Sequence, residues 1–368
     1  LADVDGDGDL DLLVLALGGP DGLFMNDGKG RFTEALDFPG RKSKYASVSA
    51  AFADVDGNGT LDLYIANHRC HTILDEMPGW VVRSVKFGQE PSQEFRDHFF
   101  FQSTTNRGIS YANPQEVGEP DVLYLNDGKG RFRDVTQEQG RWRDEAGKVM
   151  AMPKEWGLAV QFRDVNGDGA PDLYVCNDFW TPDRFWINDG TGHFQLAPRL
   201  ALRRLSSSCM GVDFADINRD GHVDFFTVDM LSRDHSRRKR QMGQMQPTPL
   251  TIGEIENRPQ IMQNTLFLNR GDNTYAEIAM LSGVKGSEWS WSPIFVDIDL
   301  DGYEDLIVTS GMLRDYMDTD TTRVLEKMEK PTLEEEKAAR LKYPMLQTQN
   351  IIFRNRGDLT FEEVSAAW

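Results

Sequence analysis

Short apolar runs recur along the chain, separated by segments rich in Asp, Gly and Asn. One kind of run has a Phe two residues before an Asp-rich segment, at Phe52, Phe162, Phe214 and Phe295. A second kind, such as "DLYIAN" and "DLYVCN", follows the Asp-rich segment directly. Runs of this length, rich in aromatic and β-branched residues and bounded by turn residues, predict β-strands.

Two further predicted strands flank a turn of the Asn-Asp-Gly or Asn-Arg-Gly type. An aromatic residue lies two positions before the first Asn of that turn, and another lies six positions after it. Asn and Gly tolerate the positive φ that such hairpin turns require. Each unit therefore has four strands, A to D, with an Asp-rich loop between A and B and the Asn-Gly turn between C and D. The turns start at Asn26, Asn126, Asn188, Asn269 and Asn355.

This order of elements repeats five times, and the compact units are about fifty residues long. Four-stranded units repeated at roughly 40–50 residues are typical of a β-propeller. We therefore predict an all-β fold, a β-propeller of four-stranded blades, with 1–368 forming a single propeller fragment. The predicted units cover approximately 1–46, 47–150, 151–205, 206–285 and 286–368.

Three units are longer than the others, and the excess always lies between strands B and C. In an up-and-down blade the A–B and C–D turns share one face, so we expect these insertions on the opposite face. Thr332 and Glu335 form a capping-box pattern that predicts a helix in the last insertion. The basic run 237–240 is predicted to be a solvated loop. The insertions cover 68–120, 231–263 and 311–349.

The Asp-rich segments share one spacing of oxygen-bearing side chains, and we call them the metal loops (3–11, 54–62, 164–172, 216–224 and 297–305). Positions 1, 3, 5 and 9 carry Asp or Asn, position 6 is always Gly, and position 7 offers its backbone carbonyl. The predicted ligand residues are Asp3, Asp5, Asp7, Asp9 and Asp11; Asp54, Asp56, Asn58, Thr60 and Asp62; Asp164, Asn166, Asp168, Ala170 and Asp172; Asp216, Asn218, Asp220, His222 and Asp224; and Asp297, Asp299, Asp301, Tyr303 and Asp305.

Ligands of this kind favour Ca²⁺, a hard cation that takes six to eight oxygens. An EF-hand shares the opening of the motif but needs a Glu at position 12, where these loops have Val, Ile or Thr inside a predicted strand. Mg²⁺ is less suited to sites built from protein ligands alone. We predict up to five Ca²⁺ ions, each joining strand A to strand B and linking metal binding to folding.

The formal net charge is −19, which argues against a nucleic-acid partner. Five bound Ca²⁺ ions would bring it to about −9. No apolar segment is long enough to span a bilayer as a helix. Three cysteines are too few for a disulfide scaffold.

The loops and the following "LFMNDGKGRF"-type turns resemble the bacterial form of the FG-GAP/VCBS repeat, the integrin α-chain type of propeller. The stretch 264–311 is similar to repeats of ASPIC/UnbV-type proteins, relatives of cartilage acidic protein. The resemblance implies a secreted or cell-surface bacterial protein with seven or eight blades. Because only five units are present, we expect the chain to be a fragment of a longer propeller. In integrins the calcium loops lie opposite the ligand face.

A binding or adhesion module for a protein or carbohydrate ligand on the insertion face is the preferred prediction. Aromatic and Arg side chains are typical of such interfaces. The alternative is a polysaccharide lyase-like enzyme, whose base would be a residue such as Tyr111, His98, Arg314 or Tyr316. The predicted partner-binding residues are Trp80, Phe99, Phe100, Tyr111, Trp180, Arg184 and Tyr316.

Overall fold

A computed structural model describes residues 1–76, 78–79, 99–106, 109–241 and 258–367. Within the hairpin at 100–114 it describes the backbone alone. The chain forms mostly β-strands, and its main sheets follow the predicted A-B-C-D order. We call each of these sheets a blade.

Blades 2 to 5 each contain the four predicted strands joined antiparallel in sequence order. Blade 1 has three, because residues before the first metal loop form only the isolated bridge Ala2–Asp11. The strands of blade 1 are β1 (Leu12–Val14), β2 (Gly22–Asn26) and β3 (Phe32–Glu34); of blade 2, β4 (Ser47–Ala53), β5 (Asp62–Asn67), β9 (Val122–Asn126) and β10 (Phe132–Asp134); of blade 3, β14 (Gly157–Arg163), β15 (Asp172–Asn177), β16 (Arg184–Asn188) and β17 (Phe194–Leu196).

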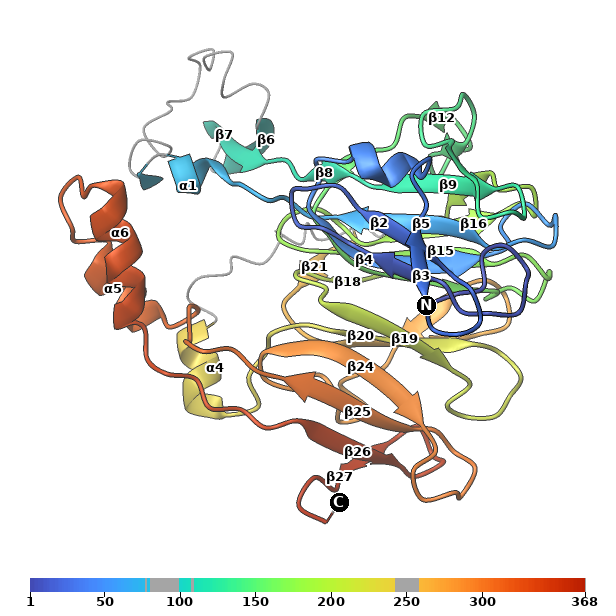
Figure 1. The fold of residues 1–368 in the computed structure, drawn as a ribbon. Coiled ribbons are helices and arrows are strands. Elements are labelled where there is room, and N and C mark those ends of the chain that lie inside the picture. Colours follow the sequence, from blue (N-terminus) through green and yellow to red (C-terminus); the bar gives the residue numbers. More distant parts are fainter. Residues whose placement is uncertain (77, 80–98, 107–108, 242–257, 368) are drawn as a thin grey trace.

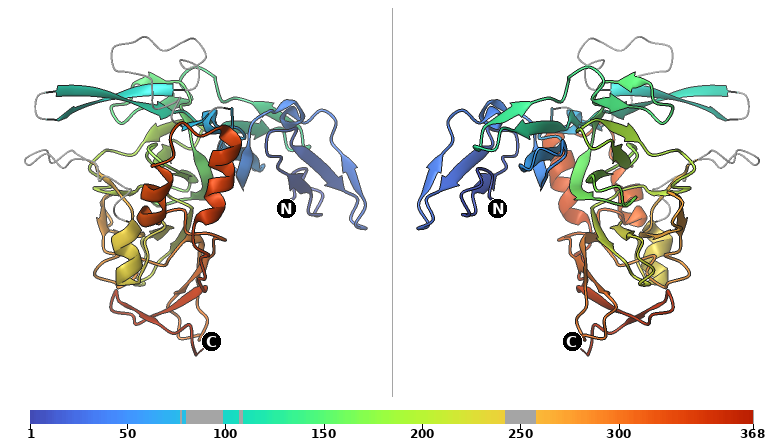
Figure 2. Two further views of the ribbon diagram at one scale, coloured as in Figure 1. Left: turned by 90° about the vertical axis from the view of Figure 1, so that its left-hand side faces the viewer. Right: turned by 90° about the vertical axis from the view of Figure 1, so that its right-hand side faces the viewer.

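Blade 4 and blade 5 complete the series. Their strands are β19 (Gly211–Ala215), β20 (Asp224–Val228), β22 (Thr265–Asn269) and β23 (Tyr275–Glu277), followed by β24 (Ser290–Val296), β25 (Asp305–Ser310), β26 (Ile351–Asn355) and β27 (Phe361–Glu363). The A strands lie next to one another: β14 packs beside β4 and β19, and β19 packs beside β24. The blades therefore succeed one another around their A strands, and the two chain ends lie apart (Figure 2).

The core lies between successive blades rather than inside any one of them. Strand β5 shows why, because its side chains alternate between two buried faces. Leu63 and Ile65 pack with blade 1, whereas Tyr64 packs with blade 3. Strand β15 does the same, with Val175 toward blade 2 and Tyr174 toward blade 4. Each B strand is therefore an almost continuous apolar run, as expected for a sheet covered on both faces.

The outer edge of blade 3 carries two strands that the sequence pattern did not predict. Strand β11 (Trp142–Arg143) pairs parallel with β17, and β12 (Val149–Met150) pairs with β11. Trp142 stacks on Phe194 with ring centroids 5.2 Å apart. These residues fall within the predicted second unit, so the connection from blade 2 also fastens blade 3.

The described parts of the insertions lie on the side of the blades opposite the metal loops (Figure 1). The capping box of Thr332 and Glu335 is present and starts α6, as predicted. None of the helices in the described part of the chain is long and apolar enough to cross a membrane. The insertions and remaining connections form η1 (Pro39–Lys42), α1 (Ile73–Glu76), β6 (Phe99–Asn106), β7 (Ile109–Glu116), β8 (Glu119–Pro120), β13 (Lys154–Glu155), β18 (Leu205–Ser206), α4 (His235–Gln241), β21 (Gln260–Ile261), α5 (Thr319–Leu325), α6 (Leu333–Ala339) and η2 (Arg340–Lys342).

Candidate functional site

Each metal loop is folded around its first aspartate. In the second loop, Asp54 accepts the N–H of Asn58 on Oδ1 at 3.0 Å and the N–H of Gly59 on Oδ2 at 2.8 Å. The position-6 Gly has positive φ in all five loops, for example 86° at Gly59, so the predicted tight turn is present. Position 5 accepts the N–H of position 7, which bends the chain further. These pairs are Asp7–Asp9, Asn58–Thr60, Asp168–Ala170, Asp220–His222 and Asp301–Tyr303.

The position-9 aspartate joins the metal loop to the neighbouring C–D turn. Asp172 accepts the N–H of Val165 on Oδ2 at 3.2 Å and the N–H of Asn188 on Oδ1 at 2.8 Å. The same two bonds occur in every blade, and all five carboxylates are buried. This residue therefore holds loop and turn together in addition to its predicted role as a metal ligand. The five are Asp11, Asp62, Asp172, Asp224 and Asp305.

Carboxylates from positions 1, 3 and 9 converge in three of the loops. One oxygen from each member lies within 4.8 Å of the others. Three carboxylates at this spacing repel one another, and the arrangement of hard, negatively charged oxygens fits a divalent cation such as Ca²⁺. The sets are Asp3, Asp5 and Asp11; Asp54, Asp56 and Asp62; and Asp297, Asp299 and Asp305.

The remaining two loops have Asn at position 3, and this changes their charge. Asn166 donates from Nδ2 to Asp168 at 2.9 Å, and Asn218 does the same to Asp220 at 2.9 Å. In both loops the Asn amide group therefore donates a hydrogen bond to one oxygen of the position-5 carboxylate. In the fifth loop Arg354 forms an ion pair with Asp299, which offsets part of the charge there. The five loops therefore differ in electrostatics, although they share one backbone shape.

Burial raises the pKa of the position-9 aspartates in the second to fifth loops. It is the largest cause for Asp62, whose pKa is about 6, and for Asp172 and Asp224, whose pKa values are about 7. Repulsion from the position-1 carboxylate of the same loop acts in the same direction, whereas the two backbone N–H donors oppose it. In these three loops, additional positive charge would therefore lower the electrostatic energy.

In blades 2 to 5, the asparagine of the C–D turn connects its blade to the metal loop of the preceding blade. Asn188 donates from Nδ2 to the carbonyl of Val55 in the second loop at 2.9 Å and to Pro171 of its own loop at 3.2 Å. Asn126, Asn269 and Asn355 make the equivalent cross-blade bonds. Asn26 of blade 1 bonds only its own loop through Nδ2, and its buried Oδ1 has no hydrogen-bond partner in the described part of the chain.

A second carboxyl clip closes blades 2 and 3 at the insertion end. Asp121, just before strand C, accepts the hydroxyl of Tyr64 at 2.7 Å and the N–H of Asn67 at 2.7 Å, both from strand B. Asp183 repeats this with the hydroxyl of Tyr174 at 2.8 Å and the N–H of Asn177 at 2.9 Å. The sequence analysis missed this clip, although the repeated Pro-Asp before strand C was its signal.

Replacing Asp121 with Asn should make stability less dependent on pH. Burial is the main reason that the pKa of Asp121 rises from 3.8 to about 7. A raised folded-state pKa means that the stabilising contribution is complete below about pH 4 and is lost as pH rises through 7. Asp121→Asn should therefore gain stability relative to the native chain, by about 1.4 kcal/mol per pH unit crossed, between pH 4 and 7.

Urea unfolding of the two chains at pH 5 and pH 8 measures this difference directly. Tyr64→Phe is the matched variant. It removes the hydroxyl that donates to Asp121, so the pKa of Asp121 should rise and the loss of stability should occur at higher pH. Parallel loss of stability in the native chain and Asp121→Asn would show that this carboxyl is already ionised at pH 5.

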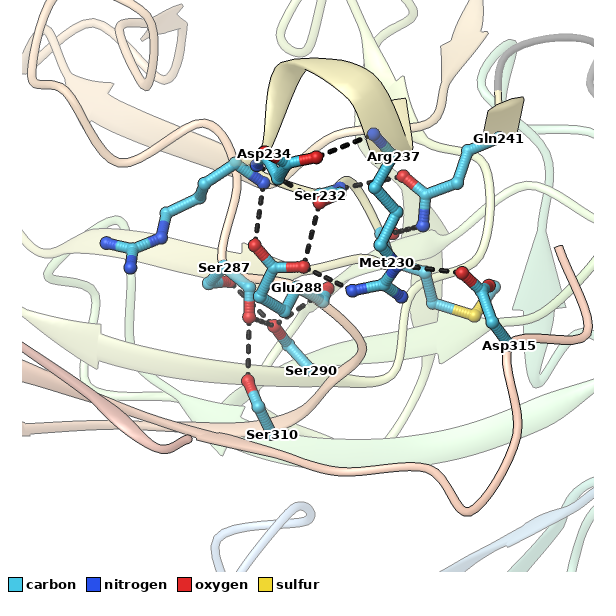
Figure 3. A network of polar contacts seen from close by, with 11 residues as sticks. Met230, Ser232, Asp234, Arg237, Gln241, Ser287, Glu288, Ser290, Ser310 and Asp315 are labelled. Carbon is cyan, nitrogen blue, oxygen red and sulfur yellow. Dashed lines mark hydrogen bonds and ion pairs between the residues drawn. The ribbon is translucent and has the colours of Figure 1, made fainter. Parts of the chain in front are cut away.

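A polar network on the insertion face joins two insertions to the ends of blades 4 and 5 (Figure 3). Arg237 of α4 pairs with Glu288 and, through Nε at 2.8 Å, with Asp315. Ser232 donates from Oγ to Glu288 at 2.8 Å. The prediction of a solvated loop at 237–240 is therefore wrong. The run forms most of α4, and Arg237 and Arg240 form ion pairs with acidic residues of neighbouring segments.

The predicted partner-binding residues occupy different environments. Phe99 is buried, and Arg184 is held by Glu155, with Nε donating to Oε2 at 2.8 Å. Tyr316 packs its ring against Tyr343, to whose carbonyl Arg314 also donates. The backbones of Phe100 and Tyr111 lie in the β6–β7 hairpin. The predictions for Trp80, His98 and the side chains of Phe100 and Tyr111 lie outside what the structure describes.

Trp180 is exposed, and its neighbour Phe179 was not predicted. Phe179 has φ of 58°, and the two side chains are 43% and 37% exposed. Their ring centroids lie 5.3 Å apart with the planes tilted by 33°. The indole of Trp180 donates to the carbonyl of Glu116 at 2.8 Å, and Phe179 also contacts Trp156 edge-on. We call Phe179 and Trp180 the aromatic pair.

The backbone of the aromatic pair is fixed by its own loop. Asp178 accepts the N–H of Phe179 at 2.7 Å, and the hydroxyl of Thr181 donates to the carbonyl of Asp178 at 3.0 Å. Positive φ in a bulky residue costs free energy and persists only when neighbouring contacts determine it. The pair is therefore a pre-organised apolar surface on the insertion face.

Fold and loops together define a β-rich repeat protein whose blades each carry an acidic A–B loop. The model of the FG-GAP-like repeat matches residues 3–65, 164–227 and 256–308. The matched regions contain all five metal loops, and they leave out the insertions 68–120 and 311–349. The resemblance to FG-GAP repeats is thus supported, and the finer one to ASPIC/UnbV-type proteins stays a prediction.

This chain is also similar, at low sequence identity, to two solved structures. One is an Agrocybe aegerita lectin described as recognising non-reducing terminal N-acetylglucosamine, with 13% identity and a TM-score of 0.32 over 96% of this chain and 78% of the lectin. The other is an ancestral GH74 enzyme, with 11% identity and a TM-score of 0.39 over 84% of this chain and 29% of the enzyme. The curated proteins compared with this chain include no match.

Proposed function

We propose that this protein is a calcium-stabilised β-propeller that acts as an extracellular binding or adhesion module, with a carbohydrate or protein ligand on the insertion face. The proposal rests on the different side chains that the two faces of the blades present. Acidic loops gather on one face, where their carboxylates are tied to the backbone. The opposite face presents the aromatic pair on a fixed loop.

The metal would be held by the carboxylates of positions 1, 3 and 9, with Asn at position 3 in the third and fourth loops. Bound Ca²⁺ would supply positive charge that lowers the repulsion among these groups. Extracellular calcium modules work at 10⁻⁴–10⁻³ M, which suits a secreted or cell-surface protein. The role of the ion here is structural, because it fastens strand A to strand B.

The end blades support a ring completed by further blades of the same kind. Val14 and Phe32 are exposed on blade 1, and Ile294 and Val296 are exposed on blade 5. Wherever two successive blades meet, from blade 1 to blade 5, the equivalent faces are buried against one another. At the same edge of blade 1, Asn26 Nδ2 donates to Leu10 of its own loop, whereas the other turn asparagines also donate to the preceding blade in the described part of the chain.

A saccharide panel tests the binding proposal. Pyranose rings stack on exposed aromatic side chains, so Phe179→Ala and Trp180→Ala should each weaken binding about tenfold, measured by calorimetry in saturating Ca²⁺. Phe32→Ala is the matched control, because it removes an exposed aromatic ring from the metal-loop end of blade 1.

Unchanged binding in both pair variants would place the ligand elsewhere. The same calorimetry with purified candidate proteins tests the other ligand class. If Phe179→Ala and Trp180→Ala weaken binding of a protein but of no saccharide, the ligand is a protein rather than a carbohydrate.

A further inference from the structure

His68 and Asp178 bring two polar side chains to the aromatic pair. His68 directly follows β5 of blade 2, and Asp178 directly follows β15 of blade 3. The imidazole ring of His68 packs edge-on against Trp156, with ring centroids 4.9 Å apart, and its centroid lies 6.1 Å from that of Phe179. Asp178 precedes Phe179 in the chain and accepts its N–H at 2.7 Å. The two polar side chains therefore border the aromatic surface.

The two side chains face each other across a short gap. Nε2 of His68 lies 3.8 Å from Oδ2 of Asp178. That separation is too long for a direct hydrogen bond, whose heavy atoms lie within about 3.2 Å of each other. A single hydroxyl oxygen beside the gap can lie about 2.8 Å from both atoms, donating to the carboxylate and accepting from the imidazole N–H. The pair thus has the spacing of a site that one hydroxyl group completes.

Both polar groups remain available to a ligand. Oδ1 of Asp178 accepts the N–H of Phe179, which leaves Oδ2 facing His68. Within the described ranges of the chain, neither ring nitrogen of His68 makes a hydrogen bond, and Nε2 approaches only the Asp178 carboxylate. The side chains of His68 and Asp178 are 20% and 11% exposed, so both are accessible from outside.

The backbone on both sides of the gap is fixed. His68 donates its N–H to the carbonyl of Ala46 at 2.9 Å, and its own carbonyl accepts the N–H of Glu119 at 3.0 Å. Asp178 donates its N–H to the carbonyl of Trp156 at 2.9 Å. Trp156 therefore holds Asp178 through its carbonyl and contacts His68 through its ring. A ligand at this gap meets groups that are already in place, which lowers the entropic cost of binding.

The carboxylate at the gap favours an uncharged ligand. An ionised carboxylate accepts hydrogen bonds and has none to donate, so a sugar hydroxyl suits it. An acidic substituent in the same place would repel Asp178, and the formal charge of −19 adds to that repulsion. A neutral pyranose has apolar C–H groups on its face and hydroxyls at its edge, so it fits the aromatic pair and the gap together.

We propose that His68 and Asp178 together bind one hydroxyl group of an uncharged saccharide whose ring lies on the aromatic pair. This inference rests on the proposed carbohydrate-binding function and names both the class of sugar and the residues that select it. Oδ2 of Asp178 accepts the hydroxyl proton, and Nε2–H of His68 donates to the hydroxyl oxygen. The aromatic pair supplies the apolar contact, whereas the two polar groups determine which hydroxyl the sugar must carry.

Monodeoxy sugars test the proposal on the native chain. Calorimetry in saturating Ca²⁺ first identifies the tightest binder among the methyl glycosides of glucose, galactose, mannose and N-acetylglucosamine. The same measurement is then made with the derivatives of that sugar that each lack one ring hydroxyl. At least one derivative should bind about tenfold more weakly, because two polar groups lose the partner that they share.

His68→Phe and Asp178→Asn should each weaken binding of the complete sugar about tenfold. The Phe ring keeps the contact with Trp156, and the Asn side chain keeps an oxygen for the N–H of Phe179. The sensitive deoxy sugar should bind both variants about as well as it binds the native chain, because the hydroxyl that it lacks has no partner left to lose. His71→Phe is the matched control, because it removes an exposed histidine from the same connection.

Charge selectivity provides a second readout. The native chain should bind the uronic acid of the chosen sugar more weakly than the neutral glycoside, and Asp178→Asn should reduce that difference several-fold. Asp37→Asn removes an exposed carboxylate from the connection between blades 1 and 2, so it should leave the difference unchanged. Equal selectivity in the two variants would assign the rejection of acids to net charge and overturn the ligand class proposed for this site.

The inference would be overturned if every deoxy sugar lost the same affinity in the native chain and in His68→Phe. Binding that still depended on Phe179 would then leave the binding module standing. Failure of all the saccharides to bind would overturn the inference together with the carbohydrate assignment. Because the deoxy series uses the native chain, its result holds even if a variant does not fold.

Discussion

Removing Ca²⁺ with EGTA should lower the midpoint of thermal unfolding by about 10 °C or more, and added Ca²⁺ should restore it. Each occupied site contributes about 2.7 kcal/mol when free Ca²⁺ exceeds its dissociation constant a hundredfold. The physical reason is the convergence of three carboxylates within 4.8 Å in the first, second and fifth loops. Mg²⁺ should restore less, because it dehydrates reluctantly.

Asp56→Asn separates metal binding from a purely structural role of the loop. This change gives the second loop the position-3 residue that the third and fourth loops already have. In EGTA the variant should be at least as stable as the native chain, because one repelling charge is gone. In Ca²⁺ it should be less stable, because a charged ligand is missing. A calcium site in this loop would be contradicted if Asp56→Asn changed the free energy of unfolding in the same direction in EGTA and in Ca²⁺. It would also be contradicted if EGTA left the unfolding midpoint of the native chain unchanged.

Asn188→Ala should destabilise the protein by about 3 kcal/mol in urea unfolding. The buried side chain donates to Val55 of blade 2 and to Pro171 of its own blade, and its Oδ1 accepts the N–H of Gly190 at 3.1 Å. Truncation leaves one buried and two partly buried polar groups without their partner, and such groups cost more than the bond itself contributes.

Asn26→Ala is the matched control, because it changes the same residue of the same turn in blade 1. Among the described residues, Asn26 Nδ2 makes no cross-blade bond and donates to Leu10 of its own loop at 3.2 Å. Its loss should cost about 1 kcal/mol. Similar losses for both variants would show that the cross-blade bond contributes nothing, and that only the turn geometry matters.

The strand order of the blades could be predicted because each element has its own local signal. The apolar, aromatic and β-branched run in "DLYIAN" and the Asn-Gly turn of the same unit are local signals for strands, and blades 2 to 5 follow them. The spacing of acidic residues likewise placed Asp54, Asp56 and Asp62 within reach of one another, because a tight loop with Gly59 leaves few ways to arrange them.

The contacts that sequence reasoning missed depend on residues far apart in the chain. Asp121 reaches Tyr64 only once strands B and C are paired across a long insertion. The side chain of Arg237 is largely buried because it forms ion pairs with Glu288 and Asp315, which come from distant segments of the chain. Phe179 lacked a sequence signal, since its exposure follows from a positive φ that Asp178 helps to fix.

In blades 2 to 5, the bond from the C–D asparagine to the preceding metal loop gives the molecule a polarity. Val4 accepts from blade 2, Val55 from blade 3, Val165 from blade 4 and Ile217 from blade 5. A disturbance in one loop is therefore passed to the blade that follows it in sequence. A substitution that distorts one metal loop should therefore destabilise the C-terminal neighbouring blade before the N-terminal one.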